Sequence, residues 1–180
     1  MAIRQRKPTS PGRRFQSVSS FDEITKSKPE KALLTKKNRT GGRNSYCRIT
    51  SRHRGGGHKQ KYRIIDFTRN KDSIVAKVAA IEYDPYRTCR ICLLHFADGE
   101  KRYVLAWSGV NVGDSYVCGD TAEIKAGSRK QLKDIPDGFT IFALELTPFT
   151  KGKLIRSAGS YATIAGRDEA TGAVIVKLQS

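Results

Sequence analysis

Residues 90–107, which read RICLLHFADGEKRYVLAW, decide the fold of this chain. Two runs rich in aliphatic and aromatic residues, Arg90–Phe96 and Lys101–Trp107, flank the dipeptide Asp98-Gly99. Asp-Gly between two apolar runs is a strong signal for a hairpin turn, because these residues tolerate the backbone angles that such turns require. The stretch therefore predicts an antiparallel β-hairpin.

Short strands are predicted on both sides of this hairpin. Upstream, Tyr62–Phe67 and Ile74–Tyr83 are rich in Ile, Val and Tyr, and turn residues separate them. Downstream, Tyr116–Cys118 and Ala122–Lys125 are shorter runs of the same kind. No amphipathic helix interrupts the series. We therefore expect an all-β fold in which residues 60–125 form a small closed Greek-key barrel, since closure removes exposed strand edges.

Residues 126–180 repeat this style and predict a second small barrel. After a polar connector, strands are expected at Phe139–Leu146, Lys153–Ile155, Tyr161–Ala165 and Ala173–Leu178, with glycines between them. The alternation of the last strand continues almost to Ser180. A domain rarely stops inside a strand pattern, so this barrel is expected to be incomplete at its C-terminus.

Charge divides the chain into two unlike parts. The whole sequence holds 34 Lys and Arg against 17 Asp and Glu, a net charge of +17. Residues 1–63 carry 18 of these cations and 3 acids, whereas residues 64–180 carry 16 and 14. An excess of +15 on one third of the chain points to a polyanionic partner, and a small acidic substrate would not require it.

Residues 1–59 are expected to form a long extended basic segment. They carry prolines and glycines with bases between them, and they show little hydrophobic periodicity. Such a segment buries too little apolar surface to offset its ordering entropy, so we expect mobile structure that orders on its partner. A solvated tail is the alternative.

The densest basic stretch spans residues 52–63 and reads RHRGGGHKQKYR. Three glycines allow close backbone approach and positive φ angles, and their amides can face phosphate oxygens. Arg and Lys neutralise phosphate charge, and Arg also bonds to base edges or stacks on bases. Gly-Lys-Ser/Thr and a parallel βαβ unit are absent from the sequence pattern, so this is not a nucleotide-binding P-loop. A flexible charged linker is the alternative.

Two further basic stretches lie nearer the N-terminus, and a smaller basic loop lies in the second predicted barrel. Three basic stretches on irregular backbone favour wrapping of folded RNA over a single groove or a nuclear-localisation signal. The candidate RNA-binding residues are Arg13, Arg14, Lys36, Lys37, Arg39, Arg43, Asn44, Arg52, His53, Arg54, Gly55, Gly56, Gly57, His58, Lys59, Lys61, Arg63, Arg156 and Ser157.

Metal binding and catalysis find little support in the sequence. Cys89 and Cys92 form one CxxC, but a zinc site needs four ligands and the other cysteines and histidines are scattered. Residues i and i+3 of a strand also face opposite sides, so buried or half-exposed thiols are the better interpretation. His95 is expected to be a packed or edge histidine, and Trp107 and the tyrosines are expected to be core residues rather than base-stacking platforms. No catalytic residue, metal or cofactor is predicted.

Neither a membrane span nor a secretory signal is predicted. The longest apolar runs, such as Thr140–Leu146, are far shorter than the roughly 20 residues of a spanning helix. The first twenty residues lack an apolar central region. Four cysteines do not make a disulfide scaffold in a chain of this length, so an intracellular, reducing location is expected.

Seven segments, in order along the whole chain, resemble the bacterial-type large-subunit ribosomal protein L2 family. They are residues 7–14 (KPTSPGRR), 41–44 (GGRN), 52–59 (RHRGGGHK), 62–67 (YRIIDF), 82–85 (EYDP), 98–103 (DGEKRY) and 156–159 (RSAG). The resemblance implies an OB-fold barrel followed by an SH3-like barrel, with extended segments that penetrate large-subunit rRNA. It implies roles in subunit assembly, subunit association and tRNA placement near the peptidyl transferase centre, where RNA is the catalyst.

Two departures from the family pattern matter. Family members continue into a basic, glycine-rich C-terminal arm, whereas this sequence stops at Ser180 and is expected to be either the ordered part of a longer protein or a truncated form. The roles of that arm are therefore not carried over to any residue here. The family also has residues other than cysteine at positions 89 and 92, which weakens the case for zinc further.

The leading hypothesis is a non-enzymatic rRNA-binding constituent of the large ribosomal subunit, in the cytoplasm or in an organelle. Its partners would be large-subunit rRNA and other ribosomal proteins, with tRNA or the small subunit nearby, and no membrane or small-molecule substrate. The alternatives are a single-strand nucleic-acid-binding OB-fold module or RNA chaperone, and a zinc or redox protein built on the cysteines.

Overall fold

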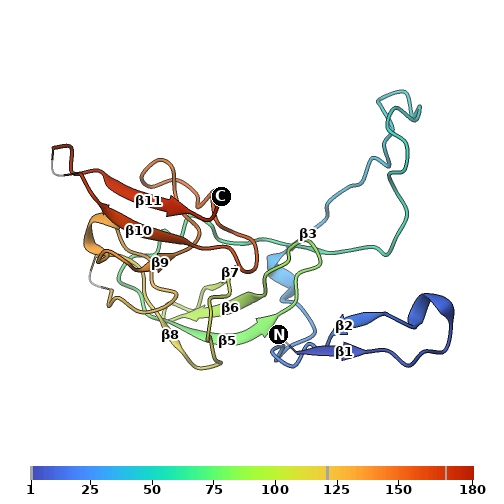
Figure 1. Cartoon of the computed structure of the whole chain (residues 1–180), viewed down its shortest axis with the longest axis horizontal. Coiled ribbons are helices and arrows are strands. Elements are labelled where there is room, and N and C mark those ends of the chain that lie inside the picture. Colours follow the sequence, from blue (N-terminus) through green and yellow to red (C-terminus); the bar gives the residue numbers. More distant parts are fainter. Residues whose placement is uncertain (1, 121, 169) are drawn as a thin grey trace.

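The computed structural model describes residues 2–120, 122–168 and 170–180, and its regular elements in these ranges are β-strands and short 3-10 helices (Figure 1). None of the helices described is long and apolar enough to span a membrane. The elements in chain order are β1 (Ile3–Gln5), η1 (Pro11–Arg13), β2 (Ser17–Ser19), η2 (Lys31–Leu33), β3 (Leu34–Thr35), β4 (Tyr62–Arg63), β5 (Ala76–Glu82), β6 (Ile91–Phe96), β7 (Lys101–Leu105), β8 (Ser115–Tyr116), η3 (Leu132–Asp134), β9 (Thr140–Ile141), β10 (Ala162–Arg167) and β11 (Val174–Leu178).

A curled four-stranded antiparallel sheet with the order β7-β6-β5-β8 forms the centre of the molecule. The predicted hairpin is confirmed as β6 and β7, with Asp98-Gly99 in the turn. Gly99 has a φ of +85°, and its amide donates to the carbonyl of Phe96 over 3.0 Å. The turn therefore uses glycine for the conformational freedom that the sequence pattern indicated.

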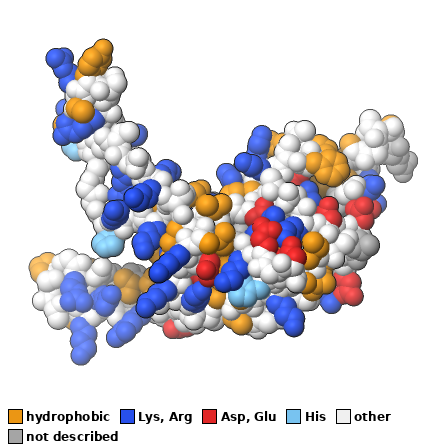
Figure 2. Space-filling model, turned by 180° about the vertical axis from the view of Figure 1, so that it is seen from behind, with side chains coloured by type: hydrophobic (Ala, Val, Ile, Leu, Met, Phe, Trp, Pro, Cys, Tyr) orange, Lys and Arg blue, Asp and Glu red, His pale blue; other side chains and the backbone are white. Residues whose placement is uncertain are grey.

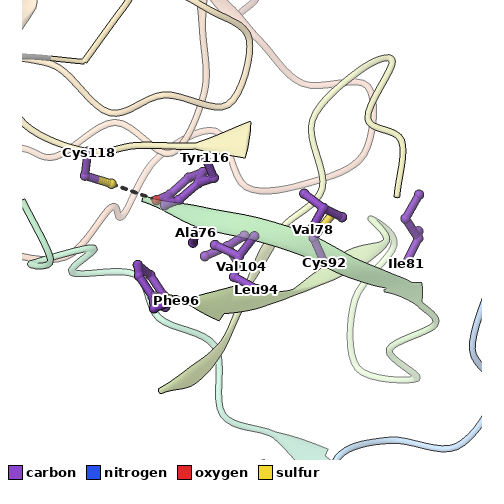
Figure 3. Close-up of a cluster of buried hydrophobic side chains, with 9 residues drawn as sticks. All are labelled: Ala76, Val78, Ile81, Cys92, Leu94, Phe96, Val104, Tyr116 and Cys118. Carbon is purple, nitrogen blue, oxygen red and sulfur yellow. Dashed lines mark hydrogen bonds between the residues drawn. The ribbon is translucent and has the colours of Figure 1, made fainter. Parts of the chain in front are cut away.

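Both faces of this sheet are buried, which explains why β6 is apolar along nearly its whole length. Cys92, Leu94 and Phe96 point into one cluster with residues of β5, β7 and β8 (Figure 3), while Ile91 and Leu93 point into a second. The period of two fixes this division. A β-bulge between Val78 and Ala80 shifts the register of β5 against β6 and increases the local curl.

A three-stranded sheet with the order β9-β10-β11 lies in residues 126–180. This part of the chain contains less regular structure than the sequence predicts. The expected strand Phe139–Leu146 is reduced to Thr140–Ile141, and Lys153–Ile155 forms only an isolated bridge from Leu154 to Leu144. Ala143 and Ile155 have φ angles of +54° and +58°, which interrupt an extended backbone.

The predicted strand Ala122–Lys125 is also absent. The amide of Ala122 donates to Gly119, and the amide of Lys125 donates to Glu123, so local turns replace the ladder there. By contrast, β5, β10 and β11 lie where Ile74–Tyr83, Tyr161–Ala165 and Ala173–Leu178 were expected. Runs whose backbone stays extended were therefore predicted well, whereas runs interrupted by positive φ angles or local turns were not.

The N-terminal residues contain more structure than the expectation of an extended segment allowed. β1 and β2 pair as an antiparallel hairpin, and β3 pairs with β4. Residues 24–35 lie against the central sheet: the amide of Ile81 donates to Thr25 Oγ1 over 2.9 Å, and the amide of Glu30 donates to Tyr103 Oη over 2.8 Å. These partners are far away in sequence, so local patterns carry no sign of them.

Candidate nucleic-acid interface

Two basic projections leave the central sheet, as Figure 1 shows. One is the N-terminal hairpin, residues 2–20, and the other is the arm, residues 36–60. Lys and Arg side chains line both of them in Figure 2. The structure leaves the following predicted residues exposed on these projections: Arg13, Arg14, Lys36, Lys37, Arg39, Arg43, Asn44, Arg52, His53, Arg54, Gly55, Gly56, Gly57, His58 and Lys59.

The arm has a defined shape although it buries no residue. Arg39 ties the two sides of its base together, because Nη1 donates to the carbonyl of Gly56 over 3.0 Å and Nη2 donates to Gln60 Oε1 over 2.8 Å. Part of the guanidinium is therefore engaged within the protein. Arg39 shapes the arm in addition to carrying charge.

Gly42 closes the outer part of the arm. Its carbonyl accepts hydrogen bonds from the amides of Thr50 and Ser51, over 2.9 and 3.1 Å. The φ of Gly42 is +74°, and a Cβ added there would lie 2.1 Å from the carbonyl oxygen of Ser51. Any larger residue must displace the backbone, so glycine is required at this crossing.

Asn44 builds the turn at the tip of the arm. Its Oδ1 accepts from the amides of Tyr46 and Arg48, each over 3.0 Å. Such side-chain to backbone bonds are the usual reason for asparagine in a turn. The oxygen of this predicted RNA contact is therefore already occupied within the protein.

The three glycines at 55–57 differ from Gly42 in their surroundings. All three have positive φ angles, +116°, +69° and +74°. A Cβ would meet nothing within 4 Å at Gly56, and its nearest contacts at Gly55 and Gly57 would lie at 3.6 and 3.8 Å. Their backbone conformation needs glycine, and the open space beside it leaves room for another molecule to approach closely.

Lys61 and Arg63, at the foot of the arm, differ in their exposure to solvent. Lys61 is exposed, but Arg63 is only 8% exposed, and its Nη1 donates to the carbonyl of Lys61 over 2.8 Å. Burial raises the pKa of the Glu82 carboxyl, and the positive charge of Arg63 opposes this rise without cancelling it. The prediction that Arg63 contacts RNA is not supported by this buried position, because β4 turns the side chain inward.

A cluster of cations and aromatic rings lies beside the foot of the arm. Lys37 Nζ lies 5.7 Å from the centre of the Tyr62 ring and 5.3 Å from that of Tyr86. The guanidinium carbons of Arg87 and Arg156 lie 5.0 and 4.9 Å from the centre of the Phe67 ring. These distances are within the range of cation–π contacts.

Arg87 is fixed in this cluster by a buried carboxylate. Its Nε donates to Asp84 Oδ2 over 3.0 Å, and its Nη2 lies 3.2 Å from Tyr62 Oη. Sequence reasoning did not select Arg87 or Tyr86. The signal was the tyrosine and arginine directly after the turn Asp84-Pro85, but only the fold shows that they face the arm.

The predicted residues Arg156 and Ser157 belong to the same region. Cys89 Sγ donates to the carbonyl of Arg156 over 3.3 Å, and the amide of Ala158 donates to Thr88 Oγ1 over 3.1 Å. Both Arg156 and Ser157 remain exposed. A loop of the second sheet is thereby held against the loop that carries Arg87.

Cys89 and Cys92 lie on opposite sides of the central sheet, as the sequence pattern predicted. Cys92 packs in one buried cluster and Cys89 against the other. Burial raises the pKa of the Cys92 thiol to about 12. Among the described residues, no group of three or more His, Cys, Asp or Glu side chains is placed to hold a metal ion. His95 is exposed on the strand rather than packed.

Fold and surface together define an all-β protein that presents cations to a polyanion on two projections. Family models then identify it. Residues 30–118 match the model described as Ribosomal Proteins L2, RNA binding N-terminal domain. Residues 125–180 match the model described as Ribosomal Proteins L2, C-terminal domain. The chain belongs to the ribosomal protein L2 family, and it is an rRNA-binding constituent of the large ribosomal subunit with a structural rather than a catalytic role.

Proposed function

We propose that the protein binds folded large-subunit rRNA with its two projections, while the central sheet holds these projections at fixed positions. The observation that carries this proposal is the division of charge: residues 1–63 hold 18 of the 34 Lys and Arg and only 3 acids. Most of these cations are exposed on the hairpin and the arm. Exposed cations on narrow projections suit RNA whose phosphates surround them on several sides.

The proposed RNA-contacting residues are those predicted from the sequence, without Arg63. In the arm, the exposed residues Arg52, Arg54 and Lys59 flank the three glycines in the sequence and supply phosphate contacts. At the foot, Lys37 and Arg156 act together with Arg87 in the cation and aromatic cluster. Asn44 and Arg39 contribute chiefly by shaping the arm.

We also propose the finer division of the fold. Residues 60–125 form an OB-fold barrel, residues 126–180 an SH3-like barrel, and residues 1–59 a basic rRNA-binding segment. The curl of the β7-β6-β5-β8 sheet and its two buried faces support the first assignment. The separate matches to an N-terminal and a C-terminal family domain support a boundary near residue 125.

In the ribosome, the protein supports subunit assembly, subunit association and the peptidyl transferase region. Its other partners are neighbouring ribosomal proteins, with tRNA or the small subunit close by. Family membership supports this part of the proposal. These roles apply equally to a ribosome of the cytoplasm or of an organelle.

The test replaces Arg52, Arg54 and Lys59 together by alanine and measures binding to protein-free large-subunit rRNA between low and moderate salt. Each lost phosphate contact should reduce the slope of log K against log salt by about 0.7–0.9, so the slope should flatten by about 2–3. The control replaces three exposed lysines outside the projections, Lys77 in β5, Lys133 in η3 and Lys177 in β11. The control slope should stay close to that of the parent.

An unchanged affinity and slope in the arm variant would contradict the proposed role of the arm. Equal affinity of the parent protein for an unstructured oligonucleotide would favour a single-strand-binding module, which relies on stacking over a barrel face. Folded rRNA should compete much better than such an oligonucleotide.

A further inference from the structure

The tip of the arm carries an aromatic ring that is almost fully exposed to solvent. Tyr46 is 84% exposed, whereas Tyr103 and Tyr116 are buried and Tyr62 packs edge-on against Tyr86. Figure 2 shows hydrophobic side chains beside Lys and Arg at the far end of this projection. A large ring held in water so far from any core is unusual and indicates an interaction surface.

The backbone around Tyr46 is fixed, although its ring is free. Asn44 Oδ1 accepts from the amide of Tyr46, and the amide of Cys47 donates to the carbonyl of Asn44 over 3.0 Å. Arg43 Nη1 donates to the carbonyl of Cys47 over 2.8 Å, across the same turn. The turn therefore holds the Tyr46 backbone in place before any partner arrives, which lowers the entropy lost on binding.

The charge around this ring selects the kind of partner. Residues 31–65 contain eleven Lys and Arg and no Asp or Glu. Arg43 and Arg48 flank Tyr46 on the same turn, and both are exposed. A protein partner would need a strongly acidic surface with an apolar pocket. RNA supplies both phosphates for the arginines and a flat base for the ring.

We propose that Tyr46 stacks on an unpaired base of the large-subunit rRNA while Arg43 and Arg48 contact the adjoining phosphates. This inference rests on the proposed function of the arm and adds a base contact to its phosphate contacts. The other projection has the same construction: Phe15 is 93% exposed and directly follows Arg13 and Arg14, next to the short helix η1. An aromatic ring beside arginines thus occurs on both projections.

The first test measures binding of the full chain to protein-free large-subunit rRNA. Tyr46→Ala should weaken binding about 5- to 150-fold, the range expected for one base stacked on an aromatic ring. The salt slope should not change, because no cation is lost. Tyr46→Phe should bind like the parent. Ile49→Ala, which removes another exposed apolar side chain from the same tip, is the matched control and should have little effect.

Perfectly paired duplex RNA of similar length distinguishes stacking from general attraction. It offers phosphates but no unpaired base, so Tyr46→Ala and the parent should bind it equally. Equal binding of Tyr46→Ala and parent to rRNA would overturn the inference. So would an equal loss in Ile49→Ala, or a loss in Tyr46→Phe as large as that in Tyr46→Ala.

The neighbouring thiol gives a second, direct readout. Cys47 is exposed at the tip, whereas Cys92 and Cys118 are buried. Bound rRNA should slow alkylation of Cys47, measured by mass spectrometry of its peptide, and should leave Cys92 unlabelled in both states. Full Cys47 reactivity in a complex that forms normally would exclude the tip from the interface. A Cys47 protected only after other ribosomal proteins are added would assign the tip to a protein partner and overturn the inference.

The two proposals fail separately. If Tyr46→Ala binds like the parent while the variant lacking Arg52, Arg54 and Lys59 loses affinity and salt slope, the arm binds phosphates but the stacking inference is wrong. If neither set of variants changes binding, the proposed function of the arm is wrong as well.

Discussion

The central sheet and the arm keep their shapes by opposite means. In β6, Ile91, Cys92 and Leu94 are fully buried, and hydrophobic burial on both faces holds the strand. The arm buries no residue, and its shape comes from hydrogen bonds of Arg39, Gly42 and Asn44. A segment without a core can thus be shaped in advance and still expose its cations. The comparison implies that stability and RNA binding reside in different parts of one chain.

The largest expected effect on stability comes from the core of the sheet. Leu94→Ala should lower the free energy of unfolding by about 2–5 kcal/mol, because it removes a fully buried side chain and leaves a cavity. Urea denaturation followed by circular dichroism measures this change. Ile49→Ala in the arm should stay within about 0.5 kcal/mol of the parent. Equal losses of stability in the two variants would contradict the conclusion that the sheet, and not the arm, stabilises the fold.

The next effect concerns the contact between the N-terminal segment and the sheet. Tyr103 Oη donates to Glu82 Oε2 over 2.7 Å and accepts from the amide of Glu30. Tyr103→Phe should therefore cost about 1–3 kcal/mol, since it leaves buried polar groups without partners. Denaturation at several pH values provides the measurement.

The pH dependence of this loss has a definite sign. Burial raises the pKa of Glu82, and the hydrogen bond from Tyr103 opposes that rise. Loss of the hydroxyl raises the pKa further, so the folded variant favours the protonated carboxyl more than the unfolded chain does. The deficit of Tyr103→Phe should shrink as the pH falls toward this raised pKa. A deficit that grows on acidification would contradict the assigned contact.

A smaller effect is expected from Asp66, at the edge of the sheet. Burial raises the pKa of this carboxyl, but bonds from Arg102 Nη1 over 2.7 Å and from the amide of Arg69 over 2.8 Å outweigh it, so the net pKa lies below its usual value. The stabilisation is present above the ordinary pKa and is lost as the pH falls through the lowered one. Asp66→Asn should cost about 1 kcal/mol near neutral pH.

The acid limb of the stability curve checks this expectation. The parent should lose stability below roughly pH 4, and Asp66→Asn should lose less over the same range. Asp137, which is half exposed in its ion pair with Arg167, offers a control. Asp137→Asn should leave the acid limb nearly unchanged.

The smallest effect on global stability is expected from Gly42→Ala. Its methyl group would collide with the carbonyl of Ser51, so the tip of the arm must rearrange. The free energy of unfolding should change by less than about 0.5 kcal/mol, because the arm adds nothing to the core. Amide chemical shifts should change in residues 40–52 and stay constant in β5 to β7. Shifts that spread through the sheet would show that arm and sheet are coupled.

Sequence reasoning worked best where a turn signal or a long run of β-forming residues marked the element. The hairpin of β6 and β7 follows from two apolar runs around Asp98-Gly99, and the strand β5 follows from its run of Ile, Val and Ala. The opposite facing of Cys89 and Cys92 follows from the period of two. Sequence reasoning failed for Phe139–Leu146 and Lys153–Ile155, whose apolar residues are interrupted by positive φ angles at Ala143 and Ile155. A single such residue ends a strand, and composition gives no sign of it.

The candidate interface divides in the same way. Charge density and glycine content selected the exposed cations of the hairpin and the arm. Sequence did not show that Arg63 is buried, that Asn44 and Arg39 are engaged within the protein, or that Arg87 lies beside Arg156. Each of these depends on a neighbour in space, and Arg87 and Arg156 are nearly seventy positions apart in the chain.

The sequence by itself determined the all-β class, the central hairpin and a basic N-terminal third directed at a polyanion. Net charge, composition and local apolar patterns depend only on residues that are neighbours in the sequence, so they can be determined without coordinates. Only the tertiary structure decided which cations are free, which polar groups shape the arm, and that Tyr46 stands bare at its tip. The physical reason is that exposure and hydrogen-bond partnership are properties of pairs brought together by folding.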